Sequence, residues 1–227
     1  MTRRILMAIA LAETWRRPMW QQCLALLFLA CFLTSCGHKP VQGVPGPPGT
    51  WVKLKDCRLA PSASNDGDSF HVIHDGQKFI FRLYFADAPE TDESVQDRVK
   101  EQCRYFGVTR EQLRKAGLEA KNQTTELLRK PFIVTTRSQD AMGRSQRFYA
   151  VVSIGNDDLA ETLVARGLAR AKGTLANLPD GEPAKERMKR LKKLEAEAKE
   201  NGAGIWSQSK KVEKPGWWQR VRSWFLR

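Results

Sequence analysis

The sequence is poor in acidic residues. Its 227 residues include 25 Asp and Glu against 38 Lys and Arg, which gives a formal net charge of +13 and a pI near 9.8. A surface with this excess of positive charge favours a polyanionic partner, either nucleic acid or an anionic membrane. The charge by itself does not separate these two partners.

The sequence also lacks a long hydrophobic run. The apolar run Cys23–Leu33 has about 11 residues, which is too short to span a bilayer comfortably but suits the hydrophobic region of a signal peptide. The residues Leu33-Thr34-Ser35-Cys36 at its end resemble a bacterial lipobox, in which the cysteine is acylated and becomes the new N-terminus. We therefore expect residues 1–36 to be a signal segment with lipidation at Cys36. An ordinary secretory signal and an uncleaved anchor are the alternatives.

A signal segment of this kind predicts export. The chain is then expected to be a cell-envelope lipoprotein that faces the periplasm or the exterior, or alternatively a secreted protein. Cysteine is scarce in the remainder, where only Cys57 and Cys103 are left of five. In an oxidising compartment these two could form a disulfide, and the alternative is two separate buried thiols.

Two segments of biased composition flank the expected folded unit, residues 51–207. Residues 37–50 are rich in Pro and Gly, which predicts a stiff, extended linker. Residues 208–227 are basic and rich in Trp, and as a helix they would be amphipathic. Such a helix favours the bilayer interface. The alternatives are a flap over the domain or an additional arm that binds nucleic acid.

Four β-rich runs are visible within the folded unit. Ser69–His74 and Lys78–Phe85 are joined by Asp75-Gly76, a strong hairpin signal. Phe132–Arg137 and Arg147–Ile154 form a second pair. No internal repeat is present.

Three helices are expected after or between these runs. Thr109–Arg129 begins with a capping box of Thr109 and Gln112. Asp158–Arg166 ends before a glycine, and Pro183–Asn201 carries an apolar stripe at Met188, Leu191, Leu194 and Ala198. Strands followed by helices on one side predict a small closed β-barrel with flanking helices, in the α+β class.

Residues 66–90 carry the chemistry. Four of the acids in this stretch stand out together with its one arginine: Asp66, Asp68, Asp87, Glu90 and Arg82. Carboxylates suit a hard divalent cation, an arginine fork suits a phosphate, and a spare glutamate can act on water. Each half of the stretch could by itself be a turn or a strand end, but together they indicate a site that cleaves phosphodiesters.

Several motifs resemble the signature of the staphylococcal nuclease (thermonuclease) family. They are Asp66-Gly-Asp68-Ser69, Arg82 to Glu90, Asp140-Ala-Met-Gly143-Arg144, Leu163–Ala169, and Glu195–Lys199 with Ile205-Trp206. They occur in the family's order over about residues 51–207. The resemblance implies an OB-type five-stranded barrel with about three helices. It also implies a Ca²⁺-dependent phosphodiesterase that acts on single-stranded DNA and on RNA and leaves 3′-phosphate ends.

The resemblance also assigns roles to residues. Asp68, Asp87 and the main-chain carbonyl of Ala88 would bind Ca²⁺, with Asp66 as a further acid near the metal. The catalytic residues would be the glutamate and the two phosphate-binding arginines: Glu90, Arg82 and Arg144. No protein partner is predicted.

The sequence departs from the family pattern at three places. Ala141 and Met142 stand where the family's type member has a lysine and a tyrosine, and Arg170–Thr174 replaces a segment with tyrosines. The stretch Thr91–Gly117 is longer, which predicts an added loop or helix over the site. The competing hypothesis is therefore a lipoprotein with an OB module that binds nucleic acid without cleaving it.

Overall fold

The computed structural model describes residues 44–143 and 145–209. Three expectations lie outside the described residues: lipidation at Cys36, the role of Arg144, and the amphipathic helix predicted within residues 208–227. Most of the predicted linker, up to residue 43, lies outside them as well.

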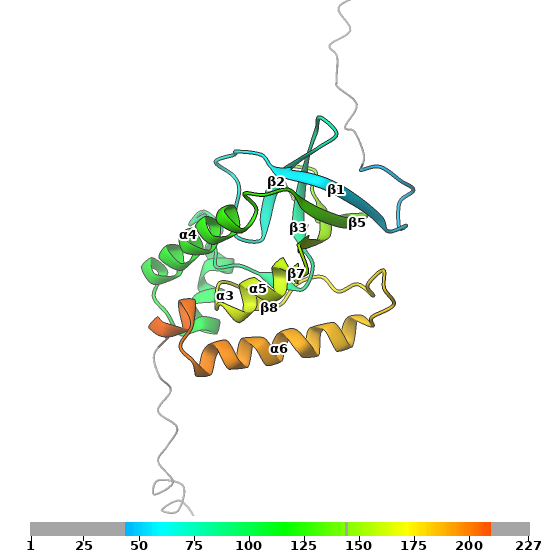
Figure 1. The fold of residues 1–227 in the computed structure, drawn as a ribbon. Coiled ribbons are helices and arrows are strands. Elements are labelled where there is room, and N and C mark those ends of the chain that lie inside the picture. Colours follow the sequence, from blue (N-terminus) through cyan, green and yellow to red (C-terminus); the bar gives the residue numbers. More distant parts are fainter. Residues whose placement is uncertain (1–43, 144, 210–227) are drawn as a thin grey trace, which may run out of the picture. The chain divides into compact units, whose positions relative to one another are not determined.

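A closed five-stranded β-barrel forms the centre of the described unit (Figure 1). The strands follow one another in the order β3-β2-β1-β5-β6, and β6 pairs back onto β3 in parallel, which closes the barrel. Their bounds are Val52–Leu59 (β1), Ser69–His74 (β2), Gln77–Leu83 (β3), Phe132–Asp140 (β5) and Phe148–Ile154 (β6). The short strand β7 (Asp157–Asp158) extends the sheet beyond β6. The predicted OB-type barrel of the α+β class is therefore confirmed.

The predicted hairpin between β2 and β3 is also confirmed. Asp75 and Gly76 both adopt positive φ angles, 47° and 73°, as a two-residue type I′ turn requires. The turn fixes a register in which Ser69 lies opposite Arg82. This register brings the residue before β2, Asp68, next to Arg82, and the Leu83 amide donates to the Asp68 carbonyl over 2.9 Å.

Four α-helices and one 3-10 helix lie within the described residues. They are α3 (Gln96–Phe106), α4 (Arg110–Leu127), α5 (Leu159–Ala165), α6 (Ala184–Glu200) and η2 (Gly204–Gln208). Both hydrogen bonds of the predicted capping box start α4. Helix α3 occupies the stretch in which an added loop or helix was expected, so the chain has one helix more than the family pattern predicted. None of the helices in the described part of the chain is long and apolar enough to cross a membrane.

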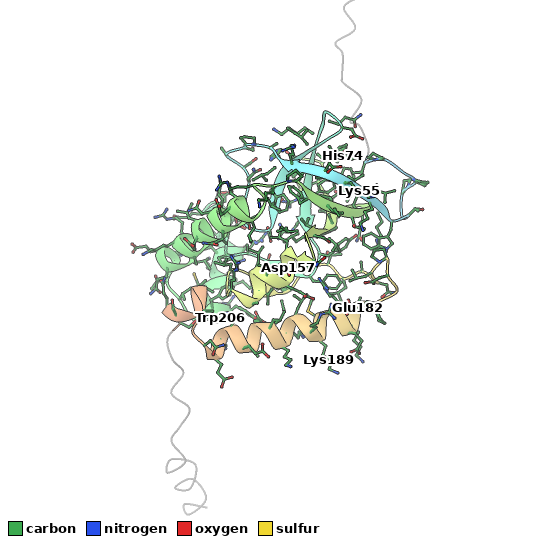
Figure 2. The ribbon with its side chains drawn as sticks, in the orientation of Figure 1. Lys55, His74, Asp157, Glu182, Lys189 and Trp206 are labelled. Carbon is green, nitrogen blue, oxygen red and sulfur yellow. The ribbon has the colours of Figure 1, made fainter. Side chains whose placement is uncertain are left out.

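Two apolar clusters hold these elements together. The larger one fills the barrel with side chains such as Phe70 and Phe81 and extends to Leu191 on α6. The smaller one anchors α3 through Phe106, whose ring centroid lies 4.9 Å from that of Trp206. Figure 2 shows Trp206 on η2, the last described helix, and its contact with Phe106 holds α3 against this helix.

Helix α6 buries one face and exposes the other. Leu191 and Ala198 of its predicted stripe are buried, and Met188 and Leu194 pack against the core. Lys189 extends from the outer face (Figure 2).

Both described cysteines are free. Cys57 is buried in the barrel cluster, where its Sγ donates to the Leu54 carbonyl over 3.5 Å. Cys103 on α3 packs against the smaller cluster. The structure thus places the two thiols in different parts of the core.

Candidate active site

The structure brings Asp68, Arg82 and Asp87 together at one end of the barrel. Asp68 directly precedes β2, Arg82 lies near the end of β3, and Asp87 lies in the short strand β4 (Ala86–Asp87). Nη2 of Arg82 lies 2.8 Å from Oδ2 of Asp68 and 3.0 Å from Oδ1 of Asp87. The side chains are 12%, 2% and 10% exposed for Arg82, Asp68 and Asp87, so this is a largely buried ion-pair cluster.

Asp66 and Glu90 complete the predicted acid set. Both line a pocket of about 630 Å³, together with Asp68 and Arg82. Oδ1 of Asp66 accepts the Gly67 amide over 2.9 Å. Oε2 of Glu90 lies 3.0 Å from Nε of an arginine on α3, Arg98. Four of the site residues predicted from residues 66–90 thus line this pocket, and Asp87 is ion-paired with Arg82 and Arg98 of its lining. The amide of Ala88 donates to Oδ2 of Asp68 over 3.1 Å.

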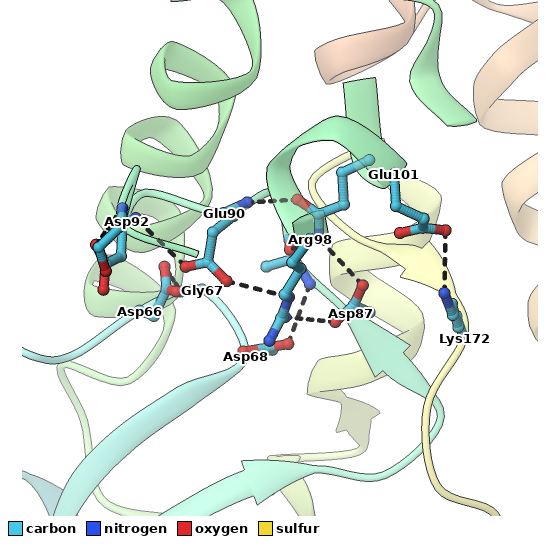
Figure 3. A network of polar contacts seen from close by, with 12 residues as sticks. Asp66, Gly67, Asp68, Asp87, Glu90, Asp92, Arg98, Glu101 and Lys172 are labelled. Carbon is cyan, nitrogen blue, oxygen red and sulfur yellow. Dashed lines mark hydrogen bonds and ion pairs between the residues drawn. The ribbon is translucent and has the colours of Figure 1, made fainter. Parts of the chain in front are cut away.

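Helix α3 contributes side chains that sequence reasoning missed. Figure 3 shows Arg98 lying between Glu90 and Asp87. Nη2 of Arg98 donates to Oδ1 of Asp87 over 2.7 Å. Gln102, one turn further along, donates to Oδ2 of Asp87 over 3.1 Å and to the Ala88 carbonyl over 2.9 Å. The i, i+4 spacing of Arg98 and Gln102 on an expected helix was the only sequence signal for them.

Arg170 was a second omission. It lies in β8 (Arg170–Ala171), which pairs with β4 in a register that sets Arg170 opposite Asp87. Its Nε donates to Oδ2 of Asp87 over 2.8 Å, and its terminal nitrogens bind the Glu101 carboxylate over 2.8 and 2.6 Å. Asp87 therefore accepts hydrogen bonds from three guanidinium groups and one amide.

The charges are unevenly compensated within the cluster. Burial raises the pKa of Asp66 to about 7, and the neighbouring Asp68 carboxylate adds to the rise. Burial also raises the pKa of Asp68, against the effect of Arg82. Burial by itself would raise the pKa of Asp87 too, but the positive charges of Arg98, Arg170 and Arg82 together hold this pKa below its usual value. The Asp66–Asp68 side of the site is thus short of positive charge.

Comparison with known families now bears on this geometry. The family model described as staphylococcal nuclease homologue matches residues 80–208. The chain belongs to the staphylococcal nuclease family. The match runs from β3 to η2 and includes Arg82, Asp87 and Glu90. No curated protein matches the chain. Membership of this nuclease family supports a nuclease-type function for the site.

The nuclease site has the right donors for Ca²⁺. Within residues 44–143 and 145–209, no group of three or more His, Cys, Asp or Glu side chains is arranged around a common metal position. However, Asp66, Asp68 and Asp87 offer carboxylate oxygens, the ligands that a hard divalent cation prefers. Burial raises the pKa of both Asp66 and Asp68, so a positive charge next to them would favour their ionised form. The Arg82 guanidinium lies between Asp68 and Asp87 and would have to shift.

The second arginine of the nuclease motif, Arg144, lies outside the described residues. Its neighbours Gly143 and Ser145 line the pocket. Arg147 lines the pocket too, and its Nε donates to the Met142 carbonyl over 2.9 Å. Burial is the main cause that lowers the pKa of Arg147. The positive charge of the Arg82 guanidinium lowers it further.

Proposed function

We propose that this chain is a Ca²⁺-dependent phosphodiesterase that hydrolyses DNA and RNA and leaves 3′-phosphate ends. One observation carries the proposal: in a chain of the nuclease family, Asp68, Arg82 and Glu90 line a single pocket, and Asp87 is ion-paired with the Arg82 of that pocket. The chain's net charge of +13 suits a polyanionic substrate.

Asp68, Asp87 and the carbonyl of Ala88 would hold the cation, with Asp66 beside them. The bound cation would neutralise and orient the phosphate that is to be cleaved. Arg82 would bind the phosphate through its guanidinium fork, and Arg144 is proposed to do the same. Both would stabilise the charge that builds on the phosphoryl oxygens in the transition state.

Glu90 would act on the attacking water. An oxygen of its carboxylate accepts a proton from the water as the water oxygen bonds to phosphorus. The bond from phosphorus to the 5′-oxygen breaks, that oxygen takes up a proton from solvent water, and Glu90 returns its own proton to the solvent. The products are a 3′-phosphate and a 5′-hydroxyl, so atoms and charge balance. No residue of this set distinguishes the 2′-hydroxyl, which agrees with action on both DNA and RNA.

We also propose that the enzyme is tethered outside the cytoplasm. The support is the apolar run Cys23–Leu33 followed by the lipobox-like residues that end at Cys36. The basic, Trp-rich residues 208–227 would add a second contact with the membrane surface. Labelling of cells with radioactive palmitate should mark the wild-type chain but not Cys36→Ser. Labelling of both chains, or of neither, would contradict the lipid anchor.

The activity is tested with the full-length chain on single-stranded DNA and on RNA, in Ca²⁺ and in EDTA. We expect cleavage only in Ca²⁺, with phosphate on the 3′ ends of the products. Asp68→Asn serves as the matched variant and should lose Ca²⁺-dependent cleavage. If the wild type binds both nucleic acids but cuts neither in any divalent metal, the chain is a non-catalytic binding module.

A further inference from the structure

Arg98 occupies the oxygens that catalysis would need. Its Nη2 lies 2.7 Å from Oδ1 of Asp87, and its Nε lies 3.0 Å from Oε2 of Glu90. The first oxygen belongs to a proposed metal ligand and the second to the proposed catalytic base (Figure 3). Oδ1 of Asp87 also accepts from Nη2 of Arg82 over 3.0 Å. A single carboxylate oxygen thus faces two guanidinium groups.

A divalent cation at Asp87 cannot share this arrangement. The cation and the two guanidinium groups repel one another, and all three compete for the same oxygen. Because Arg170 and Gln102 bind the other oxygen, Oδ2, they can keep Asp87 in place when Oδ1 changes partner. Cation binding would therefore release Arg98 from Asp87, and with it one of the contacts that hold Glu90.

A released Arg98 would remain at the pocket. Its helix is fixed on one side by the Glu101–Arg170 ion pair and on the other by the packing of Phe106 on Trp206. The side chain lines the pocket and is 31% exposed, so it is accessible from solvent. Its guanidinium would then need a new anionic partner.

Among the residues that the structure describes, three arginines line this pocket: Arg82, Arg98 and Arg147. They approach from β3, from α3 and from the residue before β6. The carboxylates of Asp66, Asp68 and Glu90 at the same pocket offset these charges in the structure, and a cation bound by the carboxylates would leave the guanidinium groups in need of another anion. A phosphodiester backbone supplies such anions at regular spacing, and a planar guanidinium can bind two of its oxygens at once.

We propose that Arg98 is a further phosphate-binding residue of this site. Before a metal binds, Arg98 is held by Asp87 and Glu90. Metal binding releases it, and it then binds the nucleic acid. This proposal rests on the proposed function, because it takes the cation and the nucleic acid from there. It assigns helix α3 a role in binding substrate in addition to its structural role.

Two binding measurements on the full-length chain test the proposal without turnover. Calorimetry gives the affinity for Ca²⁺ alone, and fluorescence anisotropy gives the affinity for a phosphorothioate-linked oligodeoxynucleotide, which resists cleavage, at saturating Ca²⁺. The variants are Arg98→Ala and Arg98→Lys. Arg104→Ala on the exposed side of α3 is the matched control, since Arg104 bonds only to the Lys100 carbonyl among the hydrogen bonds of the described residues.

We expect Arg98→Ala to bind Ca²⁺ at least as tightly as the wild type, and up to about threefold more tightly, because a competitor is lost. Its affinity for the oligodeoxynucleotide should fall at least about fivefold, as expected when a charge-assisted hydrogen bond is lost. The affinity of Arg98→Lys for the oligodeoxynucleotide should fall at least about twofold, since lysine lacks the planar guanidinium fork. The lysine variant also provides the test if the alanine variant does not fold.

Weaker Ca²⁺ binding with unchanged oligodeoxynucleotide affinity would overturn the proposal, because Arg98 would then only position Asp87. Unchanged affinities for both Ca²⁺ and the oligodeoxynucleotide would overturn the proposal as well. A wild type that binds both ligands but does not cleave DNA would refute hydrolysis. The comparison of Arg98 variants would still decide the role of this residue.

Discussion

Arg170 and Asp87 are 83 residues apart in the sequence, and Nε of Arg170 donates to Oδ2 of Asp87 over 2.8 Å in the structure. The Arg170 side chain is 1% exposed, and its guanidinium also lies 4.8 Å from the ring centroid of Tyr105. Arg170 thereby links the proposed metal ligand to helix α3 through Glu101. The position of Asp87 depends on this arginine as well as on strand β4.

Replacement of Arg170 by alanine should destabilise the fold strongly. Removal of one partner from a buried ion pair leaves Asp87 without part of its compensation, which costs about 3 kcal/mol in comparable sites. Urea unfolding measures the change. Arg129→Ala is the control, because its ion pair with Glu126 is exposed and its loss should change the stability little. Equal free energies of unfolding for the two variants would contradict the stabilising role of Arg170.

Gly117 should tolerate no side chain. A Cβ at this position of α4 would lie 2.6 Å from the Pro89 carbonyl oxygen and 2.8 Å from Cγ2 of Thr91. Alanine favours a helix by about 1 kcal/mol over glycine, but overpacking against backbone costs about 1–3 kcal/mol. We expect Gly117→Ala to lose about 1 kcal/mol of stability, measured by urea unfolding.

The loss of cleavage in Gly117→Ala should exceed the loss of stability, because Pro89 lies between Asp87 and Glu90 in the chain. Leu118→Ala is the matched control on the exposed side of the same helix, since Leu118 is 41% exposed. A gain in stability for Gly117→Ala would show that α4 does not press on the Asp87–Glu90 segment.

The Glu101 ion pair should make stability depend on pH in the acid range. Hydrogen bonds from Arg170, opposed in part by burial, lower the pKa of Glu101 to about 2. Because the pKa is lower in the folded than in the unfolded protein, the ionised Glu101 stabilises the fold at pH values above the unfolded pKa, which is near 4.5. This contribution is lost as the pH falls from there towards 2.

Glu101→Gln should therefore melt at a lower temperature than the wild type above pH 5, and the difference should vanish near pH 2. Because the Glu101 side chain is 40% exposed, solvent screening limits the difference to about 4 °C. Thermal unfolding followed by circular dichroism measures it. A difference that is constant from pH 6 to pH 2 would exclude the ionised Glu101 as its source.

The two described thiols should react at different rates. Burial raises the pKa of Cys57 to about 11, and burial also raises that of Cys103, which is only half-buried. Alkylation followed by peptide mass spectrometry should modify Cys103 in the native protein, and Cys57 only after unfolding. Recovery of a peptide pair joined through Cys57 and Cys103 would contradict the free thiols of the structure.

Local sequence signals predicted much of the fold. Asp75-Gly76 fixed the β2–β3 hairpin, and the Thr109–Gln112 capping box fixed the start of α4. Strand β1 was not identified as a separate run, because only Leu54 and Cys57 of its side chains are buried and its alternation is weak.

The acids of the site were predictable because they lie in two short motifs at strand ends. Arg98 and Gln102 were not, because their role depends on where an added helix packs. Arg170 could not be assigned from its own neighbourhood either, because its partner Asp87 is brought to it by the β4–β8 pairing. These three residues were missed because only the tertiary fold brings them to Asp87.

Glu90 is the proposed catalytic base of a Ca²⁺-dependent nuclease. The most direct test compares the wild type with Glu90→Gln on single-stranded DNA in Ca²⁺, with cleavage and binding measured on the same samples. We expect Glu90→Gln to bind DNA within about threefold of the wild type but to cleave it at least about 100-fold more slowly. Equal cleavage by both proteins, or cleavage that persists in EDTA, would contradict this proposal.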